Sequence, residues 1–216
     1  MVNKMTDTDK QTEEKIFDAA AEVFVEKGSD GARMQDIADR AGINKALLHY
    51  YYRTKDHLFD AVFQKVAGIV FKKFAPVFDE NLNLEDKIRF FYKKHIEFMS
   101  ENPKLPAFVL NEINRNPGRI KKLIRNVDFL QFWTMLEKQH HDELTRYDIT
   151  LETVPQLMTT IASLSVFPFA ARGVIETILA TVDISFEDYI EQRKEFAAEF
   201  VIGALKSREK QKNKIS

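Results

Sequence analysis

Cysteine is absent from this chain of 216 residues. Without a thiol, the protein has no disulfide, no cysteine nucleophile, no thiol redox sensor and no cysteine-rich zinc site. No apolar run follows the start of the chain, and no stretch of about 18 apolar residues occurs in it, so neither a signal peptide nor a transmembrane helix is indicated. We therefore expect a cytoplasmic protein with no membrane partner.

An excess of charge of one sign is also absent, because the formal net charge is −1 and the pI is about 6.5. This balance argues against a protein that coats nucleic acid without regard to sequence. It leaves open a sequence reader whose basic residues are gathered locally. The 44% hydrophobic content and the length allow a sizeable core, in one domain with a small second one.

Catalytic and metal-binding signatures are missing as well. The sequence contains no nucleophile elbow, no phosphate-binding loop and no paired catalytic carboxylates. His140, His141, Asp142 and Glu143 are adjacent in sequence, and adjacent helical side chains point about 100° apart instead of converging. We expect no enzyme activity, no metal and no cofactor.

Helical periodicity runs through the chain, with no strand alternation, and it predicts an all-α fold. A long helix is expected to begin near Lys55 and to end near Pro76, and Pro168 is expected to interrupt a later helix. The other expected helices, outside the stretch from 33 to 59, cover residues 12–28, 84–101, 116–147, 153–179 and 185–207, with a short one through Phe108, Val109 and Ile113. Residues 1–11 are expected to be disordered, and residues 208–216 to form a basic, solvated tail.

The stretch from Arg33 to Phe59 has the pattern of two short helices, a tight turn and the start of a third helix. Gly42 follows the first helix, where the chain needs a left-handed residue, and Asn44 is a good N-cap for the second. Leu48 and Tyr52 are spaced to face inward. This is the pattern of a helix-turn-helix that reads DNA.

The outward positions of the second short helix suit a nucleic acid. Lys45, His49 and Tyr50 are expected to face outward, and the stretch from 43 to 55 contains three basic residues and no acid. Thr54 is expected to cap the next helix, which places Lys55 in its first turn, where free backbone N–H groups already favour a phosphate. The alternative is a packed helical corner with ordinary surface charges.

This segment resembles the DNA-binding domain of the TetR family of bacterial transcriptional regulators, over roughly residues 12 to 60. The matching residues are Ala19, Ala20, Phe24, Glu26, Lys27, Gly28, Ile37, Ala38, Ala41, Gly42, Ile43, Lys45, Leu48, Tyr50, Tyr52, Lys55, Leu58 and Phe59. The resemblance implies a three-helix DNA-binding domain over residues 1–55. It also implies a helical domain over residues 56–207 that binds an effector and forms a homodimer.

The predicted DNA contacts combine this resemblance with the outward pattern. They are Arg33, Asn44, Lys45, Ala46, Leu47, His49, Tyr50, Thr54 and Lys55. The sequence departs from the family pattern in three places: Ala32, Arg33 and Met34 stand where the family usually has threonines, Ala46 replaces a frequent glycine, and His49 replaces a frequent aromatic. We expect these departures to alter the operator rather than to remove binding.

The resemblance also implies a pocket for a small molecule in the second domain, and 18 phenylalanines are available to line it. The predicted ligand-binding residues are Phe71, Phe91, His95, Met99, Phe129, Trp133, Phe167 and Arg172, and Asn111, Gln131, Gln139 and Thr160 are further polar candidates. The aromatic content favours an apolar or amphipathic effector. The alternative for any one aromatic is a place in the core.

The last helix repeats apolar and small residues, and the resemblance pairs it with the helix before it in a four-helix interface between two copies. The predicted interface residues are Ile161, Leu164, Tyr189, Phe196, Phe200, Gly203 and Ala204. Packing within one chain is the alternative.

Together these patterns predict a sequence-specific transcriptional regulator. We expect a repressor that an apolar or amphipathic ligand releases from a palindromic double-stranded DNA operator. A helical DNA-binding regulator without an effector, and a helical ligand carrier or enzyme, are the alternatives.

Overall fold

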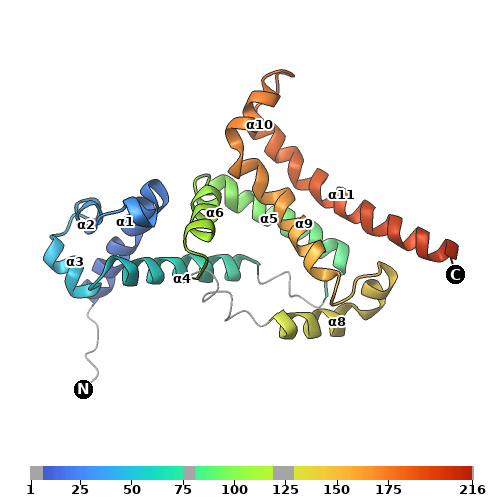
Figure 1. Cartoon of the computed structure of the whole chain (residues 1–216), viewed down its shortest axis with the longest axis horizontal. Helices are drawn as coiled ribbons and strands as arrows, with labels where there is room; N and C mark the ends of the chain where they lie inside the picture. Colours follow the sequence, from blue (N-terminus) through green and yellow to red (C-terminus); the bar gives the residue numbers. More distant parts are fainter. Residues whose placement is uncertain (1–6, 75–80, 119–128, 216) are drawn as a thin grey trace. The chain divides into compact units, whose positions relative to one another are not determined.

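The structure is a computed structural model of the whole chain and describes residues 7–74, 81–118 and 129–215 (Figure 1). Every regular element within these ranges is a helix, which confirms the all-α prediction. The helices are α1 (Asp7–Gly31), α2 (Met34–Ala41), α3 (Lys45–Tyr51), α4 (Lys55–Phe74), α5 (Leu84–Glu101), α6 (Leu105–Arg115), α8 (Phe129–Arg146), α9 (Val154–Ala170), α10 (Arg172–Leu179) and α11 (Phe186–Ile215).

The chain divides into two compact units. The first, called the N-terminal unit below, holds residues up to Phe71 and a second stretch that begins at Ala107. Most of α6 therefore belongs to the same unit as helices α1, α2, α3 and most of α4. The second, called the C-terminal unit, begins at Lys72 and holds α5 and α8 to α11. The N-terminal unit extends past the boundary at residue 55 that the sequence indicated, because Leu58 and Phe59 of α4 are buried in it.

The core of the N-terminal unit joins α1, α2, α3 and α4. Phe24 of α1 meets Phe59 of α4 edge to face, with ring centroids 5.0 Å apart. The apolar residues on the inner faces of these helices are fully buried, among them Ile16, Ala20, Val23, Ile37, Leu48 and Leu58. Arg40 of α2 forms ion pairs with Glu22 and Glu26 of α1, at 2.7 and 3.1 Å, and these hold α2 against α1.

Helix α6 reaches the N-terminal unit from much later in the sequence. Phe108 packs on Phe59 with ring centroids 5.9 Å apart. Near the end of α6, Glu112 is 2% exposed, and its carboxylate accepts hydrogen bonds from the Ser29 N–H at 3.1 Å and the Ser29 hydroxyl at 3.2 Å. Ser29 follows Gly28, whose φ of 71° breaks α1 at the predicted stop. The carboxylate thereby satisfies a backbone N–H that the break leaves without a helical partner.

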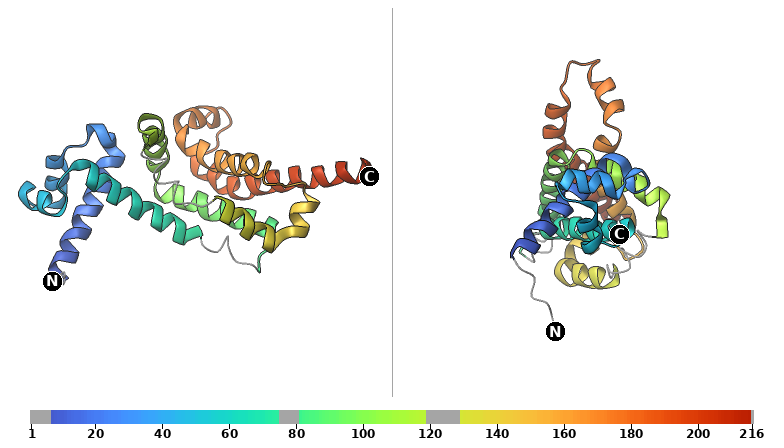
Figure 2. Two further views of the ribbon diagram at one scale, coloured as in Figure 1. Left: turned by 60° about the horizontal axis from the view of Figure 1, so that its bottom comes forward. Right: turned by 90° about the vertical axis from the view of Figure 1, so that its left-hand side faces the viewer.

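In the C-terminal unit, α5 lies along α11 and also packs on α9 (Figure 2). Apolar residues of α5 and α11 form the centre of this packing, including Ile88, Tyr92, Ile96, Ala197, Val201 and Ile202, all of which are buried. The α5 stripe follows the spacing that predicted a helix over residues 84–101.

An interruption occurs in this stretch, but three residues later than predicted: Pro168 lies inside α9, which ends at Ala170, and α10 continues at an angle of 76°. Proline has no N–H, so the carbonyl of Leu164, four residues earlier, receives no helical hydrogen bond from it. The guanidinium group of Arg193 on α11 donates to that carbonyl instead, from Nε and Nη2, each at 3.2 Å. A neighbouring helix therefore supplies donors to the carbonyl that faces the proline.

Two helix ends differ from their predicted positions. Helix α1 begins at Asp7 and not at Thr12, because no glycine or proline interrupts the residues between them. Helix α11 runs on to Ile215 through the segment expected to be a tail, and that segment also contains no helix breaker. Part of the helix predicted over residues 116–147, and Pro76 near the predicted end of α4, lie outside the described residues.

Within the described ranges, no single helix is long and apolar enough to cross a membrane. Only α9 and α10 taken together have sufficient length and apolar composition, and the two helices are sharply bent with respect to each other.

Candidate nucleic-acid interface and ligand cavity

The turn between α2 and α3 has the geometry that its sequence predicted. Gly42 is left-handed, with φ 67° and ψ 32°, and the N–H of Ile43 closes the turn by donating to the Ala38 carbonyl at 3.0 Å. The Asn44 side chain caps α3 by accepting from the Leu47 N–H at 2.7 Å. A residue with a side chain at position 42 would be strained by the positive φ. The turn therefore fixes the direction in which α3 leaves α2.

Helix α3 divides sharply into an inner and an outer face. Leu48 is fully buried, and Tyr52 just after the helix is 8% exposed, as predicted. Lys45, His49 and Tyr50 face outward, and Tyr50 is 77% exposed. An aromatic side chain held this far out of the core is the kind of residue that binding surfaces use.

The remaining predicted contacts surround this outer face. Asn44 and Ala46 are exposed and Leu47 is half-buried, while Arg33 is exposed at the start of α2. The hydroxyl of Thr54 accepts from the His57 N–H at 3.2 Å, so Thr54 caps α4 as predicted. The nine predicted residues belong to α3, to the residues that cap α3 and α4, and to the starts of α2 and α4 (Figure 1).

Two of the predicted contacts also make bonds within the protein. The Lys55 ammonium donates to the Asp30 carbonyl at 3.2 Å, which ties the start of α4 to the segment after Gly28. His49 Nδ1 donates to the Arg53 carbonyl at 3.2 Å, so its Nε2 is the ring nitrogen left to face outward. Their contacts with DNA remain predictions.

The C-terminal unit contains a cavity of about 360 Å³ between α5, α8 and α9. Its lining is almost wholly apolar and comprises Leu84, Lys87, Ile88, Phe91, Phe132, Met135, Leu136, Gln139, Val154, Leu157, Met158, Ile161 and Ala162. A small apolar cavity with a few polar groups is the usual form of a ligand site.

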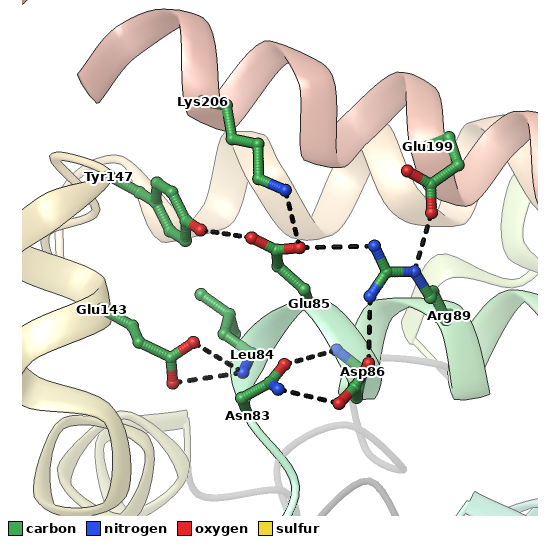
Figure 3. A network of polar contacts seen from close by, with 9 residues as sticks. All are labelled: Asn83, Leu84, Glu85, Asp86, Arg89, Glu143, Tyr147, Glu199 and Lys206. Carbon is green, nitrogen blue, oxygen red and sulfur yellow. Dashed lines mark hydrogen bonds and ion pairs between the residues drawn. The ribbon is translucent and has the colours of Figure 1, made fainter. Parts of the chain in front are cut away.

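Polar contacts fix the α5 wall of this cavity to α8 and α11 (Figure 3). Both oxygens of Glu143 on α8 accept from the Leu84 N–H at the start of α5, at 3.0 and 3.2 Å. Glu85 accepts from the Tyr147 hydroxyl at 2.6 Å and pairs with Lys206 of α11 at 2.9 Å. The first turn of α5, which carries Leu84 and Lys87, is therefore held from two sides.

These contacts also shift the acid–base properties of the network. The hydrogen bond from Tyr147, with the added effect of Lys206 and Arg89, lowers the pKa of Glu85 below its ordinary value. Burial, together with the bond to Glu85, raises the pKa of Tyr147 to about 12. The carboxylate and the neutral phenol are the forms that the folded protein favours.

Of the predicted ligand residues, the cavity lining includes Phe91. His95 stacks on Phe91 with ring centroids 5.0 Å apart, and burial lowers the pKa of His95 to about 4, which favours the neutral ring. Phe129 and Trp133 lie on α8 beside the lining residue Phe132 but do not line the cavity.

Three other predicted ligand residues lie away from the cavity. Met99 is buried near the end of α5, and Phe167 is 58% exposed. Arg172 pairs with Glu176 at 2.7 Å and Glu187 at 3.3 Å. The side chain of Phe71 lies outside the described residues.

Sequence reasoning missed Lys87, which lines the cavity and is only 3% exposed. The signal was present, because Lys87 lies four residues before Phe91 and three after Leu84, within the apolar stripe of α5. A lysine inside an apolar stripe indicates either a buried partner or a ligand.

The predicted dimer residues on α11 form an exposed apolar face. Phe196 and Phe200 are 61% and 59% exposed and stack on each other with centroids 6.2 Å apart, and Gly203 and Ala204 extend the face. Ile161, Leu164 and Tyr189 are half-buried. Exposed phenylalanines in a row are unusual for a monomer and typical of an interface.

Known proteins resemble this chain most clearly in the region of α1 to α4. The family model described as bacterial regulatory proteins, tetR family, matches residues 16–62. The chain is 47% identical over 47 residues to the HTH-type transcriptional activator FasR of Mycolicibacterium smegmatis, covering 22% of each chain. It is 20% identical over 112 residues to the fatty acid metabolism regulator protein of Bacillus subtilis, covering 52% of this chain and 58% of that one. The matched regions thus span less than two thirds of these relatives.

One solved structure extends the likeness over most of the chain. The transcriptional regulator FadR from Bacillus subtilis, in complex with stearoyl-CoA, superposes with a TM-score of 0.59 at 14% identity, covering 86% of this chain and 97% of that one. At this identity the superposition shows a shared fold.

Proposed function

Because the chain belongs to the TetR family of bacterial regulatory proteins, we propose that it is a transcriptional repressor that binds a palindromic operator as a homodimer. A small apolar or amphipathic ligand releases it from that operator. A protein of this kind acts in the cytoplasm, where its operator DNA lies.

The observation that carries the proposal is the outer face of α3. The cap at Asn44 and the turn at Gly42 hold a short helix with its N-terminal residues exposed, and the side chains of Lys45 and Tyr50 are both exposed. A helix of this size fits the major groove, with its first residues at the base edges and basic side chains near the phosphates.

The dimer follows from the apolar face of α11 and the symmetry of operators. Two copies that pair through Phe196 and Phe200 bury an aromatic stack that one copy exposes. A two-fold dimer presents two copies of α3, which read half-sites roughly 34–36 Å apart, one turn of DNA.

The effector site of the proposal is the cavity between α5, α8 and α9. A ligand there changes the packing of α5, which polar contacts tie to α8 and α11. A coupling free energy of roughly 1–3 kcal/mol between cavity and operator changes DNA affinity by about 5- to 150-fold. The apolar lining suits an acyl chain such as that of the stearoyl-CoA bound to the Bacillus subtilis regulator.

Selection of binding sites from random duplex DNA by the full-length protein tests this function. We expect an enriched palindrome, bound with an affinity that falls steeply as salt rises, because phosphate contacts release counterions. The operator placed before a reporter gene then distinguishes repression from activation.

Matched variants make the selection decisive. Lys45→Ala and Tyr50→Ala alter exposed side chains of α3 and are expected to abolish enrichment, whereas Lys93→Ala on α5 changes an exposed lysine and keeps it. No enriched sequence from a well-folded protein would contradict the proposal.

A further inference from the structure

The cavity between α5, α8 and α9 presents an almost wholly apolar surface, although polar residues take part in its lining. Among the described residues that line it, the polar ones are Lys87 and Gln139. The Lys87 ammonium donates to the Gln139 amide oxygen at 2.9 Å, and Lys87 is buried. The polar ends of the two side chains therefore cover each other, and their methylene stems form part of the apolar wall.

A polar group that enters this cavity loses its water without gaining a hydrogen bond from the wall. Moving a hydroxyl group from water to a place without a hydrogen-bond partner is costly, and moving a carboxylate is far more costly. To bond such a group, Lys87 or Gln139 would have to turn away from the partner that covers its polar end. The cavity therefore favours a ligand segment that carries no polar group.

The cavity is open to solvent along α9. Met158 and Ala162 both line the cavity, and both are exposed. A ligand can therefore keep its polar end in water beside α9 while its apolar end lies between the helices. Met135 and Met158 contribute flexible thioether side chains to the lining, and such side chains adapt to the shape of a flexible chain.

We propose that this cavity binds the methyl end of an aliphatic chain and leaves the polar end of the ligand outside. Its volume of about 360 Å³ lies near the lower end of the range for ligand sites, so it holds the end of a chain and not a large polar molecule. The site thus selects against a polar group at the far end of the chain. The inference rests on the proposed function, because it names the part of the effector that lies in the same effector site.

Two isomeric probes, 12-hydroxydodecanoate and 2-hydroxydodecanoate, test the orientation, with dodecanoate as the reference. The isomers have the same composition and charge and differ only in the carbon that carries the hydroxyl group. Isothermal titration calorimetry with the full-length protein measures the affinities, at probe concentrations below those that form micelles. We expect the 2-hydroxy isomer to bind within about threefold of dodecanoate, and the 12-hydroxy isomer at least about 10-fold more weakly, because its hydroxyl group is buried without a partner.

A polar substitution in the lining assigns the preference to this cavity. Met135→Gln keeps about the same side-chain length but places an amide in the wall. It is expected to weaken the binding of dodecanoate and to bring the 12-hydroxy isomer within about threefold of it, because the amide gives the hydroxyl group a partner. Met34→Gln makes the same change on α2, in the N-terminal unit, and should leave all three affinities unchanged. The comparison of the isomers in the natural protein decides the question if circular dichroism shows that Met135→Gln is unfolded.

Each remaining outcome overturns the inference. These are equal binding of the two isomers by the natural protein, weaker binding of the 2-hydroxy isomer, no binding of dodecanoate, and an unchanged difference in a folded Met135→Gln variant. Selection of DNA by the natural protein is measured on the same samples, because it separates the two proposals. A protein that distinguishes the isomers but selects no DNA contradicts the proposed function alone, and one that selects DNA without distinguishing them contradicts only the orientation of the ligand.

Discussion

The outer face of α3 and the cavity of the C-terminal unit are built in opposite ways. The α3 face comes from about two dozen consecutive residues, and its geometry is set by local devices, a left-handed glycine and two side-chain caps. The cavity wall comes from three helices, α5, α8 and α9, whose lining residues range from Leu84 to Ala162, and contacts between distant residues such as Glu85 and Lys206 hold it. The outer face of α3 is specified locally, whereas the cavity depends on the packing of the whole C-terminal unit.

The strongest way to sharpen this contrast is a pair of substitutions in α3. Leu48→Ala removes a fully buried side chain and is expected to destabilise the N-terminal unit by about 2–5 kcal/mol. Tyr50→Ala, two residues away, removes an exposed side chain and should change stability by less than about 0.5 kcal/mol while weakening operator binding.

Urea unfolding followed by circular dichroism, beside operator titration, measures both effects. Equal loss of stability in the two variants would mean that α3 has no separate outer face.

The stability of the N-terminal unit is expected to depend on α6, which comes from a distant part of the sequence. Glu112→Ala leaves the Ser29 N–H and hydroxyl without their acceptor, and we expect a loss of about 1–3 kcal/mol. Hydrogen exchange should rise in peptides around Ser29 before it rises elsewhere in α2 and α3. The exposed neighbour Asn114 provides the control Asn114→Ala, and unchanged exchange near Ser29 in the Glu112 variant would contradict the role given to α6.

A smaller effect is expected from the polar contacts that hold the α5 wall of the cavity. Tyr147→Phe removes the hydroxyl that donates to Glu85 and should cost about 1–2 kcal/mol, measured by Trp133 fluorescence in urea. The pKa of Glu85 is lowered in the folded protein, so Glu85 contributes stability above its ordinary pKa of 4.5, and this contribution is lost as the pH falls through the folded value.

The hydrogen bond from Tyr147 is the largest cause of the lowered pKa of Glu85. Because Tyr147→Phe lacks this bond, the variant should lose less stability than the natural protein on acidification below pH 4.5. Tyr50→Phe, in an exposed tyrosine, serves as the control. Identical acid profiles for Tyr147→Phe and the natural protein would argue against the bond.

The smallest predicted effect concerns the bend after α9. Arg193→Met removes the donors that reach the Leu164 carbonyl and should cost about 0.5–1.5 kcal/mol, since that carbonyl is only half-buried. Adding Pro168→Ala restores a helical N–H to the carbonyl, so the double variant is expected to recover the lost stability. If Pro168→Ala does not restore the stability lost in Arg193→Met, Arg193 does not act by replacing the donor that the proline lacks.

Local signals in the sequence were sufficient for the helices and for α3. Gly42, Asn44 and Thr54 act within a few residues of their own positions, and all three have the conformations that their residue types predict. The burial of Leu48 and Tyr52 followed from helical spacing in the same way.

The cavity could be predicted only in outline, because its residues meet through tertiary packing. Phe91 and Phe167 were both predicted as ligand residues because the chain is rich in phenylalanine. Phe91 lines the cavity, whereas Phe167 is exposed and lies away from it. Helical spacing gives the face of a residue on its own helix, but not which helix that face meets. Gln139 on α8, which accepts a hydrogen bond from Lys87, lies 52 residues away in sequence, and no local pattern encodes such a pair.

The contribution of α6 to the N-terminal unit has a consequence for the order in which the protein is made. Residues of α1 to α4 leave the ribosome before Phe108 and Glu112 are joined to the chain. At roughly 5–20 residues per second, the Ser29 N–H waits on the order of seconds for its acceptor. The N-terminal unit is thus not built from one contiguous stretch of chain, and a shortened message that ends before α6 yields this unit without the buried bonds between Ser29 and Glu112.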